Sequence, residues 1–283
     1  MEAPPVSAVA APAERISRRI SADGRASTAL SVGVISTYLL VIVVLPIAAV
    51  IWEAKQSGVH GFWEVVSSPD AVAALKLTFA VSFVVVLINA VLGTITAWVL
   101  VRDDFHGKSL VNSVIDLPFA LPTIVAGLTL LTLYGPNSPV GIDVAFTRTA
   151  IVVALCFVTL PFVIRTVQPV LLELDVEMEE AARSLGAGRF TVFRRIVLPN
   201  ILPGILSGSV LALARALGEI GSLVLIAGST LHTQVASVYI FNLIQDGESA
   251  QAAALAIVLL GAAFLLLLAV GVLRFYATRH ERA

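Results

Sequence analysis

Long apolar segments alternate with polar connectors along this chain. Six of them are long enough, at about 20 residues or more, to cross a hydrocarbon core of about 30 Å as helices. Among the residues of these segments, only Asp116, Arg165, Arg215 and Glu219 are charged. The pattern predicts an all-α integral membrane protein with six transmembrane helices. They cover residues 28–52, 77–101, 112–134, 149–172, 204–228 and 252–273.

Composition narrows the class further. Of the 283 residues, 58% are apolar and 13% are charged, whereas roughly a quarter are charged in soluble globular proteins. These values exclude an ordinary soluble enzyme and a disordered protein. A net charge of −1 provides no basic field for nucleic acid. The single cysteine, Cys156, lies in an apolar run and is expected to be a small buried hydrophobe.

Lysine and arginine predict the orientation, because cytoplasmic loops carry an excess of them. If the N-terminus is cytosolic, three of these side chains fall in outer loops, namely Lys55, Lys76 and Arg148, and thirteen fall in inner segments. Both termini are therefore expected in the cytosol, with six crossings between them. The thirteen inner positions are Arg15, Arg18, Arg19, Arg25, Arg102, Lys108, Arg183, Arg189, Arg194, Arg195, Arg274, Arg279 and Arg282.

The connectors divide the chain. Residues 1–27, rich in Ala, Pro and Ser, predict a disordered cytosolic tail, and residues 275–283 are expected to form a cytosolic C-terminal tail. The first span and an outer loop, partly helical around 61–67, make up residues 28–74, and the main domain covers 75–274. In the last outer loop, 229–251, residues 234–244 predict a short helix against the outer surface.

The inner loop 173–203 is too long for a simple connector. Asp175 is a plausible N-cap, because its carboxylate can accept from the first turn of a helix. Gly186 or Gly188 can provide the left-handed conformation that ends that helix. A second short helix is expected to follow and to end at Pro199 and Pro203. From these residues alone, a helix that touches lipid headgroups remains an alternative.

A sequence signature in this loop resembles a known family. Glu180-Ala181-Ala182 is separated by three residues from Gly186, which is separated by nine residues from Ile196; one further residue precedes Leu198-Pro199. This spacing is similar to the EAA signature of ABC-importer permeases. The resemblance implies the type I importer fold over residues 75–274 and a coupling helix that seats on a cytosolic ATPase. The residues implied for ATPase coupling are Glu179, Glu180, Ala181, Ala182, Leu185 and Gly186, with Gly186 making the turn.

Other segments narrow the resemblance. The run Ala214–Ser222 resembles the fifth-span motif of oxyanion permeases. Together with residues 98–102, 116–123 and 134–141, it is similar to the T-type permeases of bacterial sulfate/thiosulfate importers. Molybdate permeases share the fifth-span motif, so another oxyanion remains an alternative. The resemblance implies a bacterial plasma (inner) membrane protein that translocates sulfate or thiosulfate.

Charged groups inside the spans need a physical reason, since each costs about 2.5–3.5 kcal/mol on insertion scales. Arg215 and Glu219 are four residues apart, so they share one face of a helix and can form an ion pair. The pair is either structural or part of the pathway or gate for the anion. Arg165, near the inner end of the fourth span with Gln168, is expected to snorkel or to meet a carboxylate.

Two prolines and an asparagine are further candidates for the pathway or gate. Pro118 and Pro122 lack an N–H, so the third span is expected to bend or break near them. Broken helices line solute pathways in several transporter folds, although a packing kink is the alternative. Asn89 either donates a hydrogen bond in the pathway or joins two helices.

Two other classes of membrane protein fit the sequence less well. A secondary transporter would leave the EAA spacing unexplained, and a membrane enzyme lacks a paired-histidine metal motif or nucleophile elbow. Gly107-Lys108-Ser109 is not a phosphate loop, because Arg102 stands where the first glycine is required. We therefore expect no enzyme activity, catalytic residue, metal or cofactor in this chain, with ATP and Mg²⁺ on a partner. The expected partners are a cytosolic ABC ATPase dimer, a second homologous sulfate permease, an extracytoplasmic sulfate-binding protein and the lipid bilayer, but no nucleic acid.

Overall fold

The apolar segments fold as helices in a computed structural model that describes residues 30–228, 230 and 233–279, with side chains as far as residue 272. The predicted tail 1–27 lies outside the described residues. The chain divides into two units, Met1–Trp52 and Glu53–Ala283, which are treated separately. The first unit holds most of a helix that runs from Leu30 to Lys55, close to the first predicted span. That helix contains a π turn, Leu40–Val44, followed by α2 (Leu45–Lys55).

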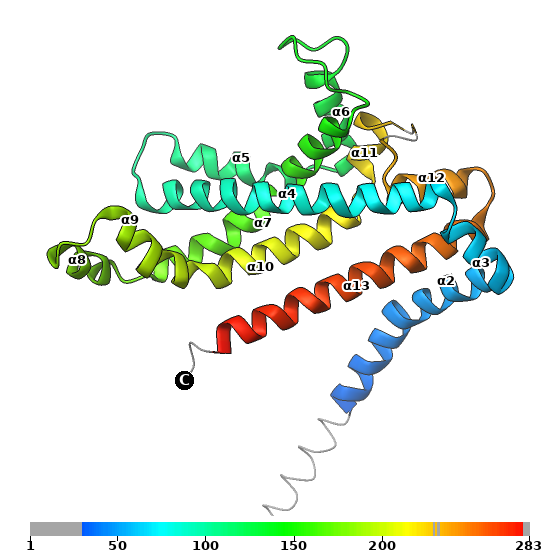
Figure 1. Ribbon diagram of the computed structural model, residues 1–283, viewed down its shortest axis with the longest axis horizontal. Coiled ribbons are helices and arrows are strands. Elements are labelled where there is room, and N and C mark those ends of the chain that lie inside the picture. Colours follow the sequence, from blue (N-terminus) through cyan, green and yellow to red (C-terminus); the bar gives the residue numbers. More distant parts are fainter. Residues whose placement is uncertain (1–29, 229, 231–232, 280–283) are drawn as a thin grey trace, which may run out of the picture. The chain divides into compact units, whose positions relative to one another are not determined.

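Four long helices form the frame of the second unit (Figure 1). They are α4 (Pro69–Arg102), α7 (Arg148–Glu173), α10 (Leu198–Leu217) and α13 (Ser249–Arg279). The helices α4, α7 and α10 pack on one another, and α13 packs on α10. The short helix α3 (Gly58–Val66) precedes α4. It agrees with the prediction that the first outer loop is partly helical around residues 61–67. These four helices contain about half of the predicted main domain, residues 75–274.

Helix α4 begins eight residues before the predicted span 77–101. The hydroxyl of Ser68 accepts a hydrogen bond from the backbone N–H of Ala71, and Pro69 occupies the first turn. Both features favour a helix start at this position. Hydropathy alone missed this start, because the first two turns of α4 mix polar and apolar residues.

The third predicted span is broken, as its prolines indicated. Helix α5 (Lys108–Ala120) and helix α6 (Thr123–Tyr134) meet at an angle of 116°. The break follows from Pro122, since a residue before proline favours extended backbone and Leu121 has ψ 133°. Pro118 lies inside α5 without ending it. By length and composition, the described residues contain five helices that could cross a membrane, and this bent pair is a sixth span if it counts as one.

The fifth predicted span, 204–228, is wrong as a single helix. A continuous helix begins earlier, at Arg189, and ends at Leu217, and α11 (Gly221–Ile226) follows as a separate element. Glu219 lies in the break, where its carboxylate accepts a hydrogen bond from the backbone N–H of Ser222 in the first turn of α11. This hydrogen bond satisfies one of the free N–H groups in the first turn of α11 and so favours a new helix start.

Pro199 and Pro203 do not end the helix that follows the inner loop, contrary to the expectation. Helix α9 (Arg189–Val192) continues through a π turn, Phe193–Val197, into α10. A proline ring clashes with the carbonyl four residues earlier in a regular helix. The π turn changes the hydrogen-bond register directly before Pro199, so the helix axis continues.

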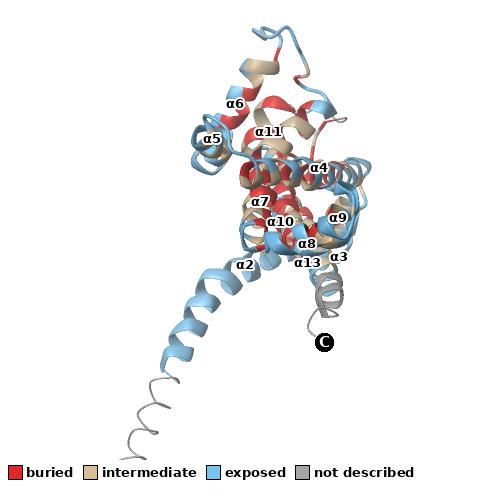
Figure 2. Ribbon diagram, turned by 90° about the vertical axis from the view of Figure 1, so that its left-hand side faces the viewer, coloured by how far each residue is buried: buried red, intermediate tan, exposed pale blue. Residues whose placement is uncertain are grey.

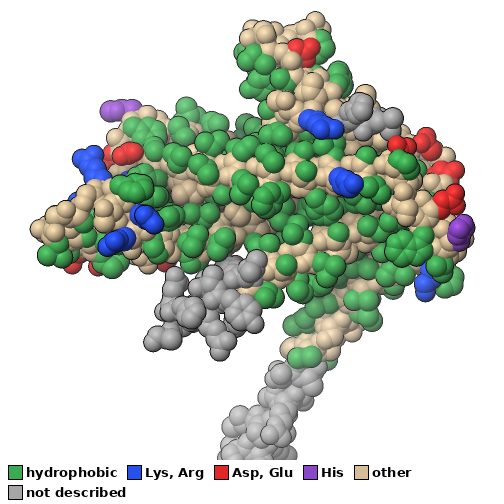
Figure 3. All heavy atoms as spheres, viewed as in Figure 1, with side chains coloured by type: hydrophobic (Ala, Val, Ile, Leu, Met, Phe, Trp, Pro, Cys, Tyr) green, Lys and Arg blue, Asp and Glu red, His purple; other side chains and the backbone are tan. Residues whose placement is uncertain are grey.

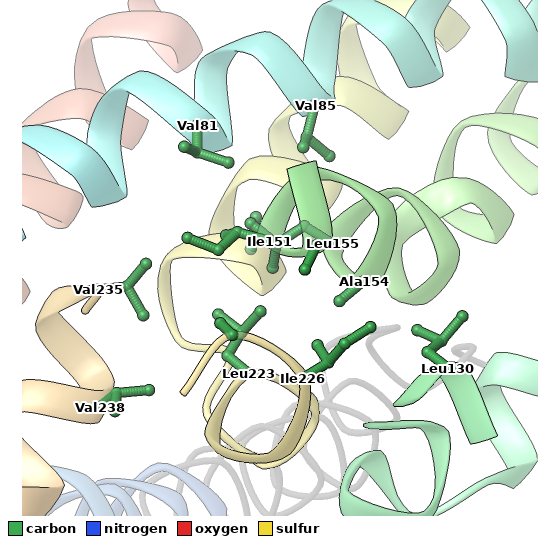
Figure 4. Close-up of a cluster of buried hydrophobic side chains, with 13 residues drawn as sticks. Val81, Val85, Leu130, Ile151, Ala154, Leu155, Leu223, Ile226, Val235 and Val238 are labelled. Atoms are coloured by element: carbon green, nitrogen blue, oxygen red, sulfur yellow. The ribbon is translucent and has the colours of Figure 1, made fainter. Parts of the chain in front are cut away.

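Burial is concentrated where the long helices meet (Figure 2), and Figure 3 shows hydrophobic side chains over much of the surface between the ends of the second unit. One apolar cluster joins Val81 and Val85 of α4 to Ile151 and Leu155 of α7 (Figure 4). A second cluster lies toward the inner loop and includes Leu100, Ile164 and Ile201.

The predicted short helix at 234–244 is α12 (Ala236–Gln245), but part of it belongs to the core. Ala236 and Val238 are fully buried. The backbone N–H of Ala236 donates to the hydroxyl of Thr78 on α4 at 2.7 Å. The helix is therefore packed into the bundle on one side rather than only lying against an outer surface.

Candidate functional site

The inner loop begins with α8 (Val176–Ser184), and both predicted ends of this helix are confirmed. The carboxylate of Asp175 accepts from the backbone N–H of Glu177 at 2.9 Å. Gly186 has φ +86°, and its N–H donates to the carbonyl of Arg183, while that of Ala187 donates to the carbonyl of Ala182. This pair of bonds is the Schellman ending, which requires a left-handed residue at Gly186.

Several residues proposed for ATPase coupling lie on an exposed surface of this loop. Glu180 and Ala181 are exposed, and the side chain of Leu185 is 90% exposed. Ala182 is half-buried against the second apolar cluster. The loop also exposes apolar side chains at Val176, Met178 and Phe190. Such a group of exposed apolar side chains is typical of a surface that contacts a partner.

Glu179 differs from its neighbours, because its side chain turns inward and is only 4% exposed. One carboxylate oxygen lies 2.5 Å from Nη2 of Arg102, at the end of α4, and the other lies 3.1 Å from Nη2 of Arg183. The sequence grouped Glu179 with the coupling surface, whereas the structure places it behind that surface.

Arg215 and Glu219 form the predicted ion pair, with 2.5 Å between Nη1 and Oε2. They do not share one face of a continuous helix, because Glu219 follows the end of α10. Glu219 is 1% exposed, and its other oxygen accepts from the backbone N–H and the hydroxyl of Ser222. The Arg215 side chain is 32% exposed. A buried carboxylate thus holds a partly accessible guanidinium beside the break between α10 and α11.

Arg165 meets a carboxylate, which confirms one of its two expected roles. Its guanidinium makes a bidentate contact with Asp116 of α5, at 2.7 and 2.6 Å. It also donates to Asn112 and Gln168. This network joins α5 to α7, and the sequences of the two helices do not by themselves indicate that Arg165 and Asp116 meet.

Asn89 lies in a helix contact, and Pro118 and Pro122 lie at or near the break in the third span. The amide of Asn89 is buried and donates to the hydroxyl of Thr159 on α7 at 2.7 Å. This geometry favours the helix-contact interpretation of Asn89. Pro118 is half-buried and Pro122 is exposed.

Sequence reasoning missed several partners of these residues. It did not connect Arg102 with Glu179, nor Ser222 and Ser237 with Glu219, whose backbone carbonyl accepts from the Ser237 hydroxyl. Arg102 and Glu179 are 77 positions apart, so no helical spacing links them. Within the part of the chain that the structure describes, no three His, Cys, Asp or Glu side chains gather as metal ligands would.

Comparison with known proteins adds the decisive observation. Residues 89–278 match the family described as binding-protein-dependent transport system inner membrane component. The chain belongs to this family. It is therefore a permease component of a transport system in the inner membrane, and not an enzyme.

Two curated relatives of this permease component cover most of its length. It is 43% identical over 251 residues to the sulfate transport system permease protein CysT of Synechocystis sp., which covers 86% of this chain and 88% of the relative. It is 42% identical over 253 residues to the protein of the same name from Salmonella typhimurium, and the match covers 87% of this chain and 91% of the relative.

Solved structures share the fold. A bacterial ABC transporter that imports the acidic polysaccharide alginate has a TM-score of 0.75 at 20% identity, with 94% of this chain and 100% of that chain covered. The MetNI methionine ABC transporter in an inward-facing conformation has a TM-score of 0.57 at 20% identity, with 74% and 96% covered. The permease component therefore has the all-helical permease fold of ABC importers.

Proposed function

We propose that this permease component is the T-type permease subunit of an ATP-driven importer for sulfate and thiosulfate. The observation that carries the proposal is 43% identity, over 86% of the chain, to a relative named as a sulfate transport permease. The motifs at residues 98–102, 116–123, 134–141 and 214–222 support the same substrate class. Sulfate and thiosulfate are both tetrahedral divalent oxyanions, so one pathway with a few cationic donors suits both.

The exposed part of the inner loop is the proposed contact with the ATPase. Glu180 and Ala181 on α8, and Leu185 at its C-terminal end, are exposed to solvent. In the proposed assembly, ATP and Mg²⁺ bind to two ATPase subunits and not to this chain. Their closure moves α8, and the helix bundle changes between inward-facing and outward-facing states. This is a population shift that the nucleotide drives, with no chemistry on the anion.

In the proposed orientation, which follows from the distribution of lysine and arginine, α8 and both termini lie in the cytosol. The contact between Arg102 and Glu179 supports this arrangement, because it brings two arginine-bearing connectors to one end of the bundle. The segment 135–147 between α6 and α7 then lies outside, where a sulfate-binding protein would deliver the anion. A second, homologous permease would complete the pathway, in which this chain forms one wall.

Arg215 is the proposed contact for the passing anion in the outer half of the bundle. Its guanidinium is partly accessible, while its partner Glu219 is buried and held by Ser222. A guanidinium has five donors, so its pairing with one carboxylate oxygen leaves donors for an oxyanion. The pair at the same time limits the cost of charge in the membrane.

A purification and an activity assay test the proposal. The tagged chain is purified from detergent-solubilised membranes, and the complex is assayed for ATP hydrolysis with sulfate-, thiosulfate- and molybdate-binding proteins. We expect an ATPase and a second permease to co-purify, and loaded sulfate-binding protein to stimulate hydrolysis. Stimulation by the molybdate-binding protein alone would keep the class and overturn the substrate. A chain that purifies alone and transports without ATP would overturn the class.

A further inference from the structure

A buried carboxylate ties the inner loop to the end of α4. Glu179 lies in the middle of α8, and Arg102 is the last residue of α4. The Glu179 side chain is 4% exposed and that of Arg102 is 19% exposed, so their contact of 2.5 Å is largely shielded from water. An ion pair in such a place is much less screened than a surface pair.

Aromatic contacts extend this link to the start of the long helix α9–α10. The guanidinium of Arg102 lies over the ring of Trp98, 5.6 Å from its centroid. The ring of Trp98 meets that of Phe193 edge to face, at 5.8 Å. Phe193 opens the π turn that leads into α10. We call Glu179, Arg183, Arg102, Trp98 and Phe193 the α8 anchor.

The α8 anchor depends on its carboxylate. The Nε atom of Arg102 is buried and has no hydrogen-bond partner among the described residues, so this guanidinium relies on the contact of Nη2 with Glu179. Removal of one partner from a buried pair leaves an uncompensated charge, which is more disruptive than the loss of a surface pair. Ala182 of α8 also packs against the apolar cluster that contains Leu100, but Glu179 provides the ion pair between α8 and the end of α4.

The outer side of α8 has a different character. Glu180 is exposed, and Leu185 at the end of the helix is almost fully exposed. Helix α8 therefore has one side free for the ATPase and one carboxylate fixed to the membrane helices. A displacement that begins on the free side has a direct polar connection to α4, and through Trp98 and Phe193 to α10.

We propose that Glu179 is the positioning residue that transmits the movement of α8 to α4 and α10, through Arg102 and Trp98. This inference rests on the proposed function, since it requires an ATPase that moves α8. It assigns Glu179 to force transmission within this chain rather than to the ATPase contact. Loss of Glu179 then separates ATP hydrolysis from transport without preventing assembly.

The test uses the complete transporter, with both permeases, the ATPase and the binding protein, in proteoliposomes. The measured quantity is the amount of sulfate transported per ATP hydrolysed. Glu179→Gln is expected to lower this ratio about 10-fold, within the ~5–150-fold range that is typical of coupling between sites. The ATPase should still co-purify with the variant. Glu173→Gln is the matched control, because Glu173 is an exposed carboxylate at the end of α7, and it should keep the wild-type ratio.

A charge swap separates transmission from simple loss of structure. The variant Glu179→Arg with Arg102→Glu and Arg183→Gln exchanges the charges of the pair and removes the arginine that would repel the new cation one helical turn away. We expect it to restore the ratio to within about 3-fold of wild type, because the pairwise term survives the exchange. If the membrane part of Glu179→Gln does not fold, the swap variant is assayed in its place, and a low ratio in an assembled swap variant contradicts the proposal.

The outcomes distinguish this inference from the proposed function. A wild-type complex that neither binds an ATPase nor transports sulfate overturns the proposed function. A wild-type complex that transports, together with Glu179→Gln at an unchanged ratio, overturns only the role of Glu179. Loss of ATPase binding in Glu179→Gln, with full folding of the membrane part, would identify Glu179 as a docking residue and also overturn the inference.

Discussion

Glu219 joins two helices and a cation with a single carboxylate. One oxygen pairs with Arg215 of α10, and the other accepts from Ser222 at the start of α11. The sequence predicted the pair from a spacing of four residues, but the reason for the helix break lies in Ser222. Because Glu219 binds both Arg215 and the first turn of α11, it favours a break between α10 and α11 that hydropathy does not indicate.

The first residue-scale prediction concerns this pair. Arg215→Met should lower the stability of the purified chain by about 3 kcal/mol, because it leaves a buried carboxylate without its cation. The double variant Arg215→Met with Glu219→Gln should lose less. The stability of both variants is measured by heating the purified chain in detergent and recording the fraction that remains monodisperse at each temperature. Equal losses in the single and double variants would contradict a stabilising pair.

The second residue-scale prediction concerns Gly186. Its φ of +86° disfavours a side chain, although a Cβ would meet no atom within 4 Å. Gly186→Val should destabilise the native conformation of the inner loop by about 1–2 kcal/mol. Co-purification of the ATPase should therefore fall about 5–30-fold while the membrane helices keep their fold.

Gly58 provides the control for this experiment. It also has a positive φ, +66°, with no atom within 4 Å of an added Cβ, but it precedes α4 at the other end of the unit. Gly58→Val introduces the same kind of strain there and should leave ATPase co-purification unchanged. If both variants lose the ATPase equally, the effect is general destabilisation and the coupling role of Gly186 is wrong.

At the scale of elements, the close approach of α6 and α11 sets the geometry beside the break in the third span. A Cβ added at Gly127 would lie 2.7 Å from backbone atoms of Ser222, which cannot move without the helix. Helix α6, which makes an angle of 116° with α5, is therefore packed closely against α11. The bend therefore depends on Pro122 locally and on Gly127 through packing.

This contact yields an element-scale prediction. Gly127→Ala should destabilise the chain by about 1–3 kcal/mol, as overpacked helix contacts do, and should lower sulfate uptake. Gly261→Ala on α13 is the matched control, because an added Cβ there meets no atom within 4 Å, so it should be neutral or slightly stabilising. A Gly127→Ala chain that melts and transports as the wild type does would exclude a tight α6–α11 contact.

At the scale of the whole molecule, the proposed orientation can be tested with thiol labelling. In a Cys156→Ala background, which lacks other cysteines, Asn137→Cys should react with a membrane-impermeant reagent in intact spheroplasts. Ser184→Cys should react only after permeabilisation, because the proposed orientation puts α8 on the cytosolic side. Both positions are exposed in the structure, so accessibility to the reagent reports the side of the membrane. The opposite labelling pattern would reverse the topology.

The sequence by itself determined the membrane class, most spans and the ends of α8. These features depend on local physics, because a membrane-spanning segment must be an apolar helix and because Asp175 and Gly186 act on backbone groups within a few residues of themselves. The resemblance in the EAA signature and in the span motifs determined the family, which the comparisons confirm.

Only the tertiary structure decided which polar side chains of different helices meet. Asn89 pairs with Thr159, Arg165 with Asp116, and Glu179 with Arg102, each between helices far apart in the chain. Such pairs leave no periodic signal, because their spacing depends on how helices pack and not on the turn of one helix. The same reason separates Glu179 from Glu180: the sequence places them side by side, and packing directs one toward α4 and the other toward solvent.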